Sequence, residues 1–132
     1  MEEIEVVTGQ HTEFLNIDRS IQAAVDASGV KRGYVQIFVP HTTAGITINE
    51  NADPDVVADM ELILERAVPW EGGYAHAEGN AAAHVKASMM GFSAMVFIEN
   101  GRLKFGTWQS IYFCEFDGPR RRRAWVNVVP AP

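Results

Sequence analysis

The sequence predicts an α+β fold, with a mostly antiparallel β-sandwich or jelly-roll-like core and two or three flanking helices. Short β-rich segments alternate with turn signals such as Asn100-Gly101, and helical periodicity recurs in only three places. The chain has 132 residues, and 47% of them are apolar, which suffices for one core. No Gly/Ser-rich or Pro-rich linker divides it, so residues 1–132 are expected to form a single domain.

The N-terminal segments predict strand followed by helix. Residues 4–17 (IEVVTGQHTEFLNI) suggest one or two short strands. Ile21, Ala24 and Val25 then continue from Ile17 at helical spacing, until Ser28-Gly29 supplies a left-handed stop.

Two further strands and a second helix follow. Residues 33–39 are β-rich and residues 45–49 alternate apolar with polar, so His41-Thr42-Thr43 falls at the bend between two strands. Asp53 is a candidate N-cap with Pro54 at the first helical position, and the apolar stripe of this helix ends before Pro69.

The C-terminal half predicts one short helix and then only strands. Asn80 is a candidate cap for a helix over 81–90 that Gly91 closes. Residues 93–99 and 102–108 flank the Asn100-Gly101 turn. Residues 109–116 and 123–129 flank a second turn signal, Asp117-Gly118-Pro119.

Composition excludes several classes of function. No basic and apolar leader opens the chain and no apolar run approaches the length of a membrane helix, so we expect a cytoplasmic protein without a membrane partner. The net charge of −6 argues against a nucleic-acid-binding protein. The run Arg120 to Arg123 alternates faces if it enters a strand. Ion pairs with carboxylates are its expected use, phosphate binding by one of the arginines is the second interpretation, and nucleic-acid binding is the third.

Polar groups concentrate between Pro40 and Val56, and three of the four histidines stand beside polar partners. His41, His76 and His84 are candidate ligands for a divalent metal, zinc or a similar ion, because imidazole is a common metal ligand; magnesium is possible. The spacing matches no zinc motif, so hydrogen bonding within the fold is the alternative for each histidine.

The neighbouring polar residues suggest an anion site. The hydroxyls of Thr42 and Thr43 suit phosphate or sulfate oxygens, with turn capping as the alternative. Glu50 and Asn51 follow a strand and could ligate a hard cation or accept a proton. Asp53 is better explained as the N-cap.

Two more groups are candidates. Asn80 and His84 lie four residues apart, on one face of the predicted helix, whereas Lys86 projects elsewhere but is long enough to reach an anion. Gln109 and Glu115 share a strand face with apolar residues, which indicates a site or a subunit interface because buried polar groups need partners.

Long motifs add a resemblance. The segments HTTAGITINEN-DP, EGNAAAHVKAS and GRLKFGTWQSIYFCEFDGPRRRR, between about Val35 and Val129, resemble the YjbQ-like family, whose members are named secondary thiamine-phosphate synthase enzymes. The resemblance implies a β-rich homotrimer with a polar site near a subunit boundary that holds a metal or an oxyanion.

The expected function is therefore that of a small-molecule enzyme, similar to a thiamine-phosphate synthase, that binds a small phosphorylated metabolite. A metal-dependent hydrolase of such a metabolite and a non-catalytic metal- or metabolite-binding trimer are the alternatives. The expected catalytic residues are Glu50, His41 and Lys86. The expected ligand-binding residues are Thr42, Thr43, Asn51, Asn80 and Gln109, and the expected metal ligands are His41, His76 and His84.

Overall fold

The computed structural model of the chain describes residues 1–132 and contains two antiparallel sheets and three helices, which confirms the α+β prediction. The five-stranded sheet has the order β1-β8-β3-β5-β6, and the three-stranded sheet has the order β2-β7-β4. The strands are β1 (Glu2–Val7), β2 (Glu13–Asn16), β3 (Arg32–Phe38), β4 (Ala44–Glu50), β5 (Ser93–Glu99), β6 (Arg102–Lys104), β7 (Gln109–Glu115) and β8 (Arg121–Pro130). The helices are α1 (Asp18–Ser28), α2 (Pro54–Ala67) and α3 (Ala81–Met90).

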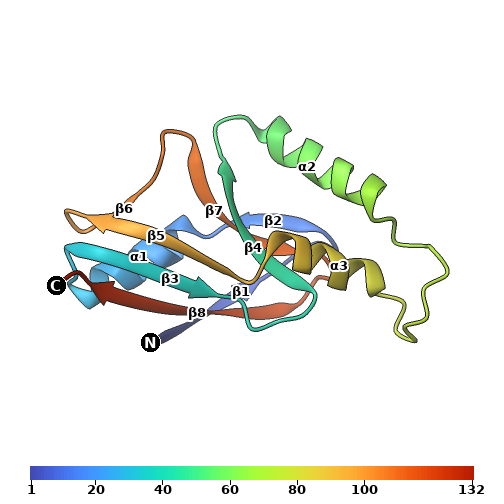
Figure 1. Cartoon of the computed structure of the whole chain (residues 1–132), viewed down its shortest axis with the longest axis horizontal. Coiled ribbons are helices and arrows are strands. Elements are labelled where there is room, and N and C mark those ends of the chain that lie inside the picture. The colour runs from blue at the N-terminus through green and yellow to red at the C-terminus, as the bar shows by residue number, and fades with distance from the viewer.

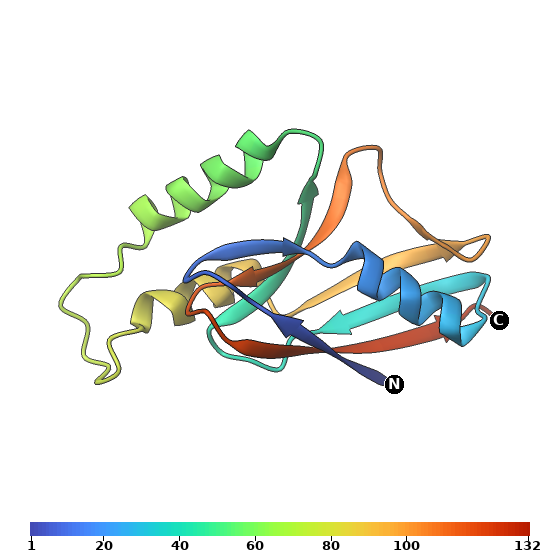
Figure 2. The same ribbon diagram turned by 180° about the vertical axis from the view of Figure 1, so that it is seen from behind.

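The main core lies between the two sheets. α1 lies on one side of the five-stranded sheet, as the two opposite views in Figure 1 and Figure 2 show. Its apolar stripe, Ile21, Ala24 and Val25, packs there against buried residues of both sheets, among them Val35 and Phe113. Gly29 ends α1 with φ 72°, as predicted.

A second apolar cluster covers the other face of the three-stranded sheet. Ala83 and Ala87 of α3 and Leu64 of α2 meet Tyr112 and Cys114 of β7. Because helices cover the face that the main core leaves open, six consecutive residues of β7 are buried, whereas β8 alternates between buried and exposed positions over most of its length.

One strand prediction needs correction. The strand expected over 102–108 ends at Lys104, and a loop leads from there to β7. The turn predicted at 117–119 is present, and it joins two strands of different sheets, β7 and β8.

α3 lies close against β4. A Cβ atom added at Gly45 would lie 2.7 Å from the carbonyl oxygen of Gly91 and 3.0 Å from that of Ala87, so glycine is needed for this approach. The backbone N–H of Ile46 donates to the Gly91 carbonyl at 3.0 Å. These contacts fix α3 beside the bend that carries His41.

α2 projects from one end of the molecule, and both ribbon views show it apart from the sheets (Figures 1 and 2). Its N-cap is Asp53, whose Oδ1 accepts the backbone N–H of Asp55 at 2.9 Å, as predicted. Only Leu64 of this helix is buried. None of the three helices has the length and apolarity needed to span a membrane.

One buried ion pair joins the two sheets. Arg122 of β8 donates from Nε to Glu115 Oε1 at 2.8 Å and from Nη2 to Glu115 Oε2. The side chains are 6% and 0% exposed. Thr8 Oγ1 also donates to Glu115 at 2.7 Å. Burial alone raises the pKa of Glu115, but hydrogen bonds from Arg122, Thr8 and the backbone N–H of Asp117 outweigh it, and the net pKa is lowered.

Glu115→Gln should lower the free energy of unfolding by about 3–5 kcal/mol at pH 7, because it leaves the Arg122 guanidinium buried without its counter-charge. A carboxyl with a lowered pKa adds stability above its ordinary value of 4.5, and this stability is lost as the pH falls through the folded-state pKa. Urea unfolding between pH 3 and pH 7 measures both effects. Glu5→Gln is the matched control, because its pair with Arg121 is exposed. Equal stability losses in the two variants would contradict the assignment.

Candidate functional site

A polar pocket of about 400 Å³ lies where the β3–β4 bend, the start of α3 and the β7–β8 turn meet. It contains the three histidines that the sequence singled out, although they lie far apart along the chain. The eleven lining residues include none of the larger apolar or aromatic residues: Pro40, His41, Thr42, Thr43, His76, Glu78, Asn80, His84, Asp117, Arg120 and Arg122.

His41 is held by the backbone of β8. Its Nε2 accepts the backbone N–H of Arg123 at 2.9 Å, which leaves the proton of the neutral ring on Nδ1. Burial lowers the pKa of His41 below 6.5, and the positive charges of Arg122 and Arg123 lower it further, against a smaller opposing effect of Glu115. His41 is therefore a neutral hydrogen-bond donor at neutral pH.

His76 and His84 form the other imidazole group of the pocket. Their ring centroids are 5.4 Å apart and the ring planes are perpendicular. His84 lies on α3, whereas His76 lies on the exposed segment 71–79, hereafter the strap, which joins α2 to α3. The only backbone hydrogen bond that strap residues make runs from the Gly79 N–H to the His76 carbonyl.

The donor set does not match a three-histidine metal site. His41 uses its Nε2 lone pair on the Arg123 N–H, and no three His, Cys, Asp or Glu side chains are grouped closely enough to hold one ion. His76 and His84 are the two imidazoles that lie together, and His41 would have to release Arg123 and change tautomer to join them.

Two arginines bring positive charge to the pocket. Arg122 is almost fully buried, and its Nη2 donates to Thr43 Oγ1 at 2.9 Å while its Nη1 has no partner within the chain. The only buried side-chain nitrogen or oxygen that lacks a partner is Asn80 Oδ1, so Nη1 of Arg122 remains accessible. Arg120 is half exposed and pairs with Asp117 Oδ2 at 3.0 Å.

The start of α3 adds further hydrogen-bond donors. Asn80 occupies the N-cap position, as predicted, but its side chain does not cap the helix. It donates from Nδ2 to Asp117 Oδ2 at 2.9 Å instead. The backbone N–H groups of Ala81 and Ala82 have no partner within the chain, and they lie at the positive end of the helix dipole.

Lys86 lies outside this pocket. It is 2% exposed on the side of α3 that faces α2, where its Nζ pairs with Glu65 Oε2 at 2.7 Å. The hydrogen bond from Lys86 lowers the pKa of Glu65. The length of the Lys86 side chain suggested that it could reach an anion, but the side chain instead forms an ion pair with α2.

Glu50, Asn51 and Gln109 lie at the far end of the three-stranded sheet. β4 begins beside Thr43 and ends at Glu50, and seven extended residues place these ends about 20 Å apart. Tyr112 Oη lies 3.0 Å from the Glu50 carbonyl oxygen and 2.9 Å from Asn51 Oδ1, and its single proton can be donated to either. Gln109 Oε1 accepts the backbone N–H of Gly106 at 2.9 Å, so the polar side chain of Gln109 has a hydrogen-bond partner in the adjacent loop.

Five pocket residues were not among the predicted site residues: Pro40, Glu78, Asp117, Arg120 and Arg122. The sequence assigned the arginine run to ion pairs, and all four arginines do pair with carboxylates. One sequence signal could have identified Arg122. Alternation of faces along a strand turns Arg122 inward, toward the bend that carries His41, and turns Arg121 and Arg123 outward.

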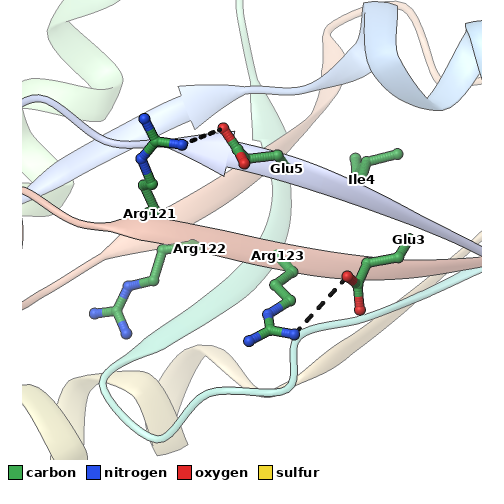
Figure 3. Close-up of a pocket in the computed structure, with 6 residues that line it drawn as sticks. All are labelled: Glu3, Ile4, Glu5, Arg121, Arg122 and Arg123. Atoms are coloured by element: carbon green, nitrogen blue, oxygen red, sulfur yellow. Dashed lines mark ion pairs between the residues drawn. The ribbon is translucent and has the colours of Figure 1, made fainter.

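Arg121, Arg122 and Arg123 also line a second pocket of about 360 Å³. Figure 3 shows Arg121 and Arg123 reaching Glu5 and Glu3 of β1, while Arg122 turns away from both carboxylates. Since the two ion pairs are exposed and span 3.6 and 3.8 Å, they contribute little to stability. Because Arg121 and Arg123 are already paired with carboxylates, we place the candidate site in the histidine pocket.

The surroundings of His41 predict its titration. Its folded-state pKa lies below 6.5, so folding opposes protonation, and stability increases as the pH rises from the folded-state pKa to 6.5. In an NMR titration, Arg123→Gln should move the pKa of His41 upward, because it removes a positive charge and keeps the backbone N–H. Arg121→Gln, which changes a neighbouring arginine of the same strand, should leave the pKa in place. Titration of parental His41 at or above 6.5 would contradict this environment.

Comparisons with known proteins agree on the family. The family model for "UPF0047 protein YjbQ-like" matches residues 2–131. A UPF0047 protein of Bacillus subtilis, YugU, is 49% identical over 127 residues, which is 96% of each chain, and one from Methanocaldococcus jannaschii is 46% identical over 125 residues, covering 95% of this chain and 91% of the relative. A crystal structure of a family member from Clostridium acetobutylicum has a TM-score of 0.95 and 52% identity, and covers 98% of this chain and all of the other. The chain therefore belongs to the YjbQ-like UPF0047 family.

Proposed function

We propose that the histidine pocket binds the phosphate group of a small phosphorylated metabolite, and that the protein is a small-molecule enzyme similar to a thiamine-phosphate synthase. The observation that carries the proposal is the set of unused donors around one polar cavity. Arg122 and His41 both line the pocket, and the Arg122 Nη1 group and the His41 Nδ1–H lack partners within the chain. Such donors suit an oxyanion.

Synthesis of thiamine phosphate would use these donors on the leaving group. The reaction joins a pyrimidine methyl diphosphate to a thiazole phosphate and expels diphosphate, so the main demand on the protein is to neutralise the departing anion. Arg122 is held rigidly by Glu115 and Thr43, and its orientation needs no rearrangement during the reaction. His84 lines the pocket and makes no side-chain hydrogen bond within the chain, and in this proposal it would protonate the departing diphosphate.

The proposal also includes a divalent metal, held by two histidines in place of the three that the sequence suggested. His76 and His84 are the residues that would hold it, in which case His84 would be a ligand and not the proton donor, and a bound ion would supply further positive charge for the phosphate. The remaining ligands would have to come from elsewhere, since His41 is engaged with Arg123. We assign no reaction step to the metal.

A metal-dependent hydrolase and a non-catalytic binding protein are the competing functions, and turnover separates them. A screen of phosphorylated metabolites for release of phosphate or diphosphate identifies the best substrate. Steady release supports an enzyme. Binding of the same compounds without release would support the binding protein.

His84→Ala should lower turnover of that substrate by on the order of 10²-fold, as expected when a general acid or base is lost. Metal content, measured by mass spectrometry, should fall as well if His84 is a ligand. Glu50→Gln should keep the parental rate, because Glu50 lies about 20 Å away at the far end of β4. A loss of rate in Glu50→Gln with a normal rate in His84→Ala would overturn the placement of the site.

We also propose that the protein is a homotrimer that associates through the outer face of the five-stranded sheet. No helix covers this face, and its centre carries Phe38, Met95, Phe97 and Trp125, which are 37–61% exposed. Phe38 and Trp125 stack with centroids 5.6 Å apart. An apolar sheet face of this kind is typical of a subunit interface.

Light scattering at micromolar concentration should give about three times the chain mass of 14.6 kDa. Phe97→Lys should dissociate the assembly, because it places a charge at the centre of the apolar face. Ile63→Lys on α2 is the matched control, since both residues are 61% exposed. A parental mass of one chain would disprove the trimer, and dissociation only by Ile63→Lys would place the interface elsewhere.

A further inference from the structure

The strap is anchored at both ends, and both ribbon views show it looping out beyond α2 and α3 (Figures 1 and 2). Before the strap, the Trp70 ring packs edge-on against His11, with ring centroids 4.5 Å apart. After it, Asn80 is buried and donates from Nδ2 to Asp117 Oδ2 at 2.9 Å. Between these anchors every residue of 71–79 is exposed. The positions of the two ends are therefore fixed, whereas the middle of the strap has no support from the core.

Few interactions hold the strap in its present conformation. The backbone N–H groups of residues 71–78 have no acceptor within the chain. The two strap carboxylates, Glu71 and Glu78, form no ion pair. Tyr74 Oη donates to the Pro69 carbonyl at 2.7 Å, but this hydrogen bond is exposed. Segments with few buried contacts and solvated backbone groups open at a low free-energy cost, so the strap can move while the rest of the fold stays intact.

Two glycines near the ends of the strap provide hinge positions. Gly73 has φ 69° and Gly79 has φ 73°, in the left-handed region that glycine adopts without strain. A Cβ atom added at either position would meet no other atom within 4 Å. The need for glycine here is therefore conformational, and no neighbour restricts the motion. A few loop residues of this kind are enough to absorb the backbone change when a loop closes.

His76 is the strap residue that can respond to a bound anion. It lines the pocket beside His84, with ring centroids 5.4 Å apart, and its ring makes no hydrogen bond within the chain. Its ring N–H is therefore available to an oxyanion. Glu78 also lines the pocket, but its carboxylate repels an anion. A ligand shifts a conformational equilibrium only through contacts that differ between the two states, and a contact with His76 supplies that difference.

We propose that the strap is a lid that closes over a phosphate bound in the pocket, held closed by a hydrogen bond from the His76 ring to the phosphate. This inference rests on the proposed binding of a phosphorylated metabolite. The strap turns about Gly73 and Gly79, while His41 and Arg122 stay in place because other strands hold them. Closure removes water from around the anion and so strengthens its interactions with the opposite wall.

Hydrogen–deuterium exchange of the full chain, read by mass spectrometry, tests the inference with inorganic phosphate as the probe and EDTA present throughout. Without phosphate the strap amides should exchange rapidly, because they have no acceptors within the chain. At saturating phosphate their exchange should slow by at least about fivefold, since the closed state shields them. The loop 105–108, at the far end of β7, is the internal control and should exchange at the same rate in both conditions.

His76→Ala separates closure from binding. This variant should still bind phosphate in titration calorimetry, about fivefold more weakly than the parent, because the free energy of closure no longer contributes to affinity. Its strap should exchange rapidly with and without phosphate. Glu71→Gln is the matched control, because Glu71 is a strap residue outside the pocket lining, and it should keep the parental affinity and the slowed exchange.

Each other outcome contradicts a different part of the inference. If phosphate binds to the parent and strap exchange does not change, the strap is no lid and the phosphate site stands. Slow exchange of the parental strap without phosphate would show that the lid has no open state. If His76→Ala keeps the slowed exchange, His76 does not hold the lid closed. Slowing that appears only when Zn²⁺ or Mg²⁺ replaces EDTA would make His76 a metal ligand and would overturn the direct hydrogen bond. If calorimetry detects no phosphate binding, the proposed function fails together with the inference.

Discussion

The buried pair of Arg122 and Glu115 is the constraint on which the rest of the site depends. Taking two charges out of water is costly, and the cost is offset here because Glu115 also accepts hydrogen bonds from Thr8 and from the Asp117 backbone. Arg122 belongs to one sheet and Glu115 to the other, so the pair sets how the sheets meet. The same guanidinium holds Thr43, at the start of β4, and so positions the bend that carries His41.

Much of the fold could be predicted because local signals and tertiary packing agree. Asp53 caps α2, Gly29 ends α1, and both follow from side-chain chemistry and backbone freedom. The extent of β6 and the crossover at residues 117–119 could not be predicted in this way. Which sheet a strand joins depends on what covers its second face, and neighbours in sequence do not determine that cover.

The candidate site, like the fold, has residues that the sequence could identify and others that depend on the tertiary structure. His41, His76 and His84 could be grouped because histidines are few and each stands among polar residues, and one pocket does bring them together. Lys86 and Glu50 have equally suitable chemistry, but α3 turns Lys86 toward Glu65, and the length of β4 separates Glu50 from the bend. Residue type indicates what a side chain can do, whereas the direction of a helix face or the span of a strand decides where it can do it.

The two walls of the pocket differ in how they are supported, and this bears on how the family could diversify. The wall with His41 and Thr43 is tied to the buried pair, and changes there disturb both sheets. The strap with His76 and Glu78 is exposed over residues 71–79 and has no backbone hydrogen bonds to the sheets. Each doubling of a flexible loop costs only about 0.6 kcal/mol of closure entropy. Insertions or deletions in the strap can therefore resize the entrance of the pocket, while the wall with His41 and Thr43 stays unchanged.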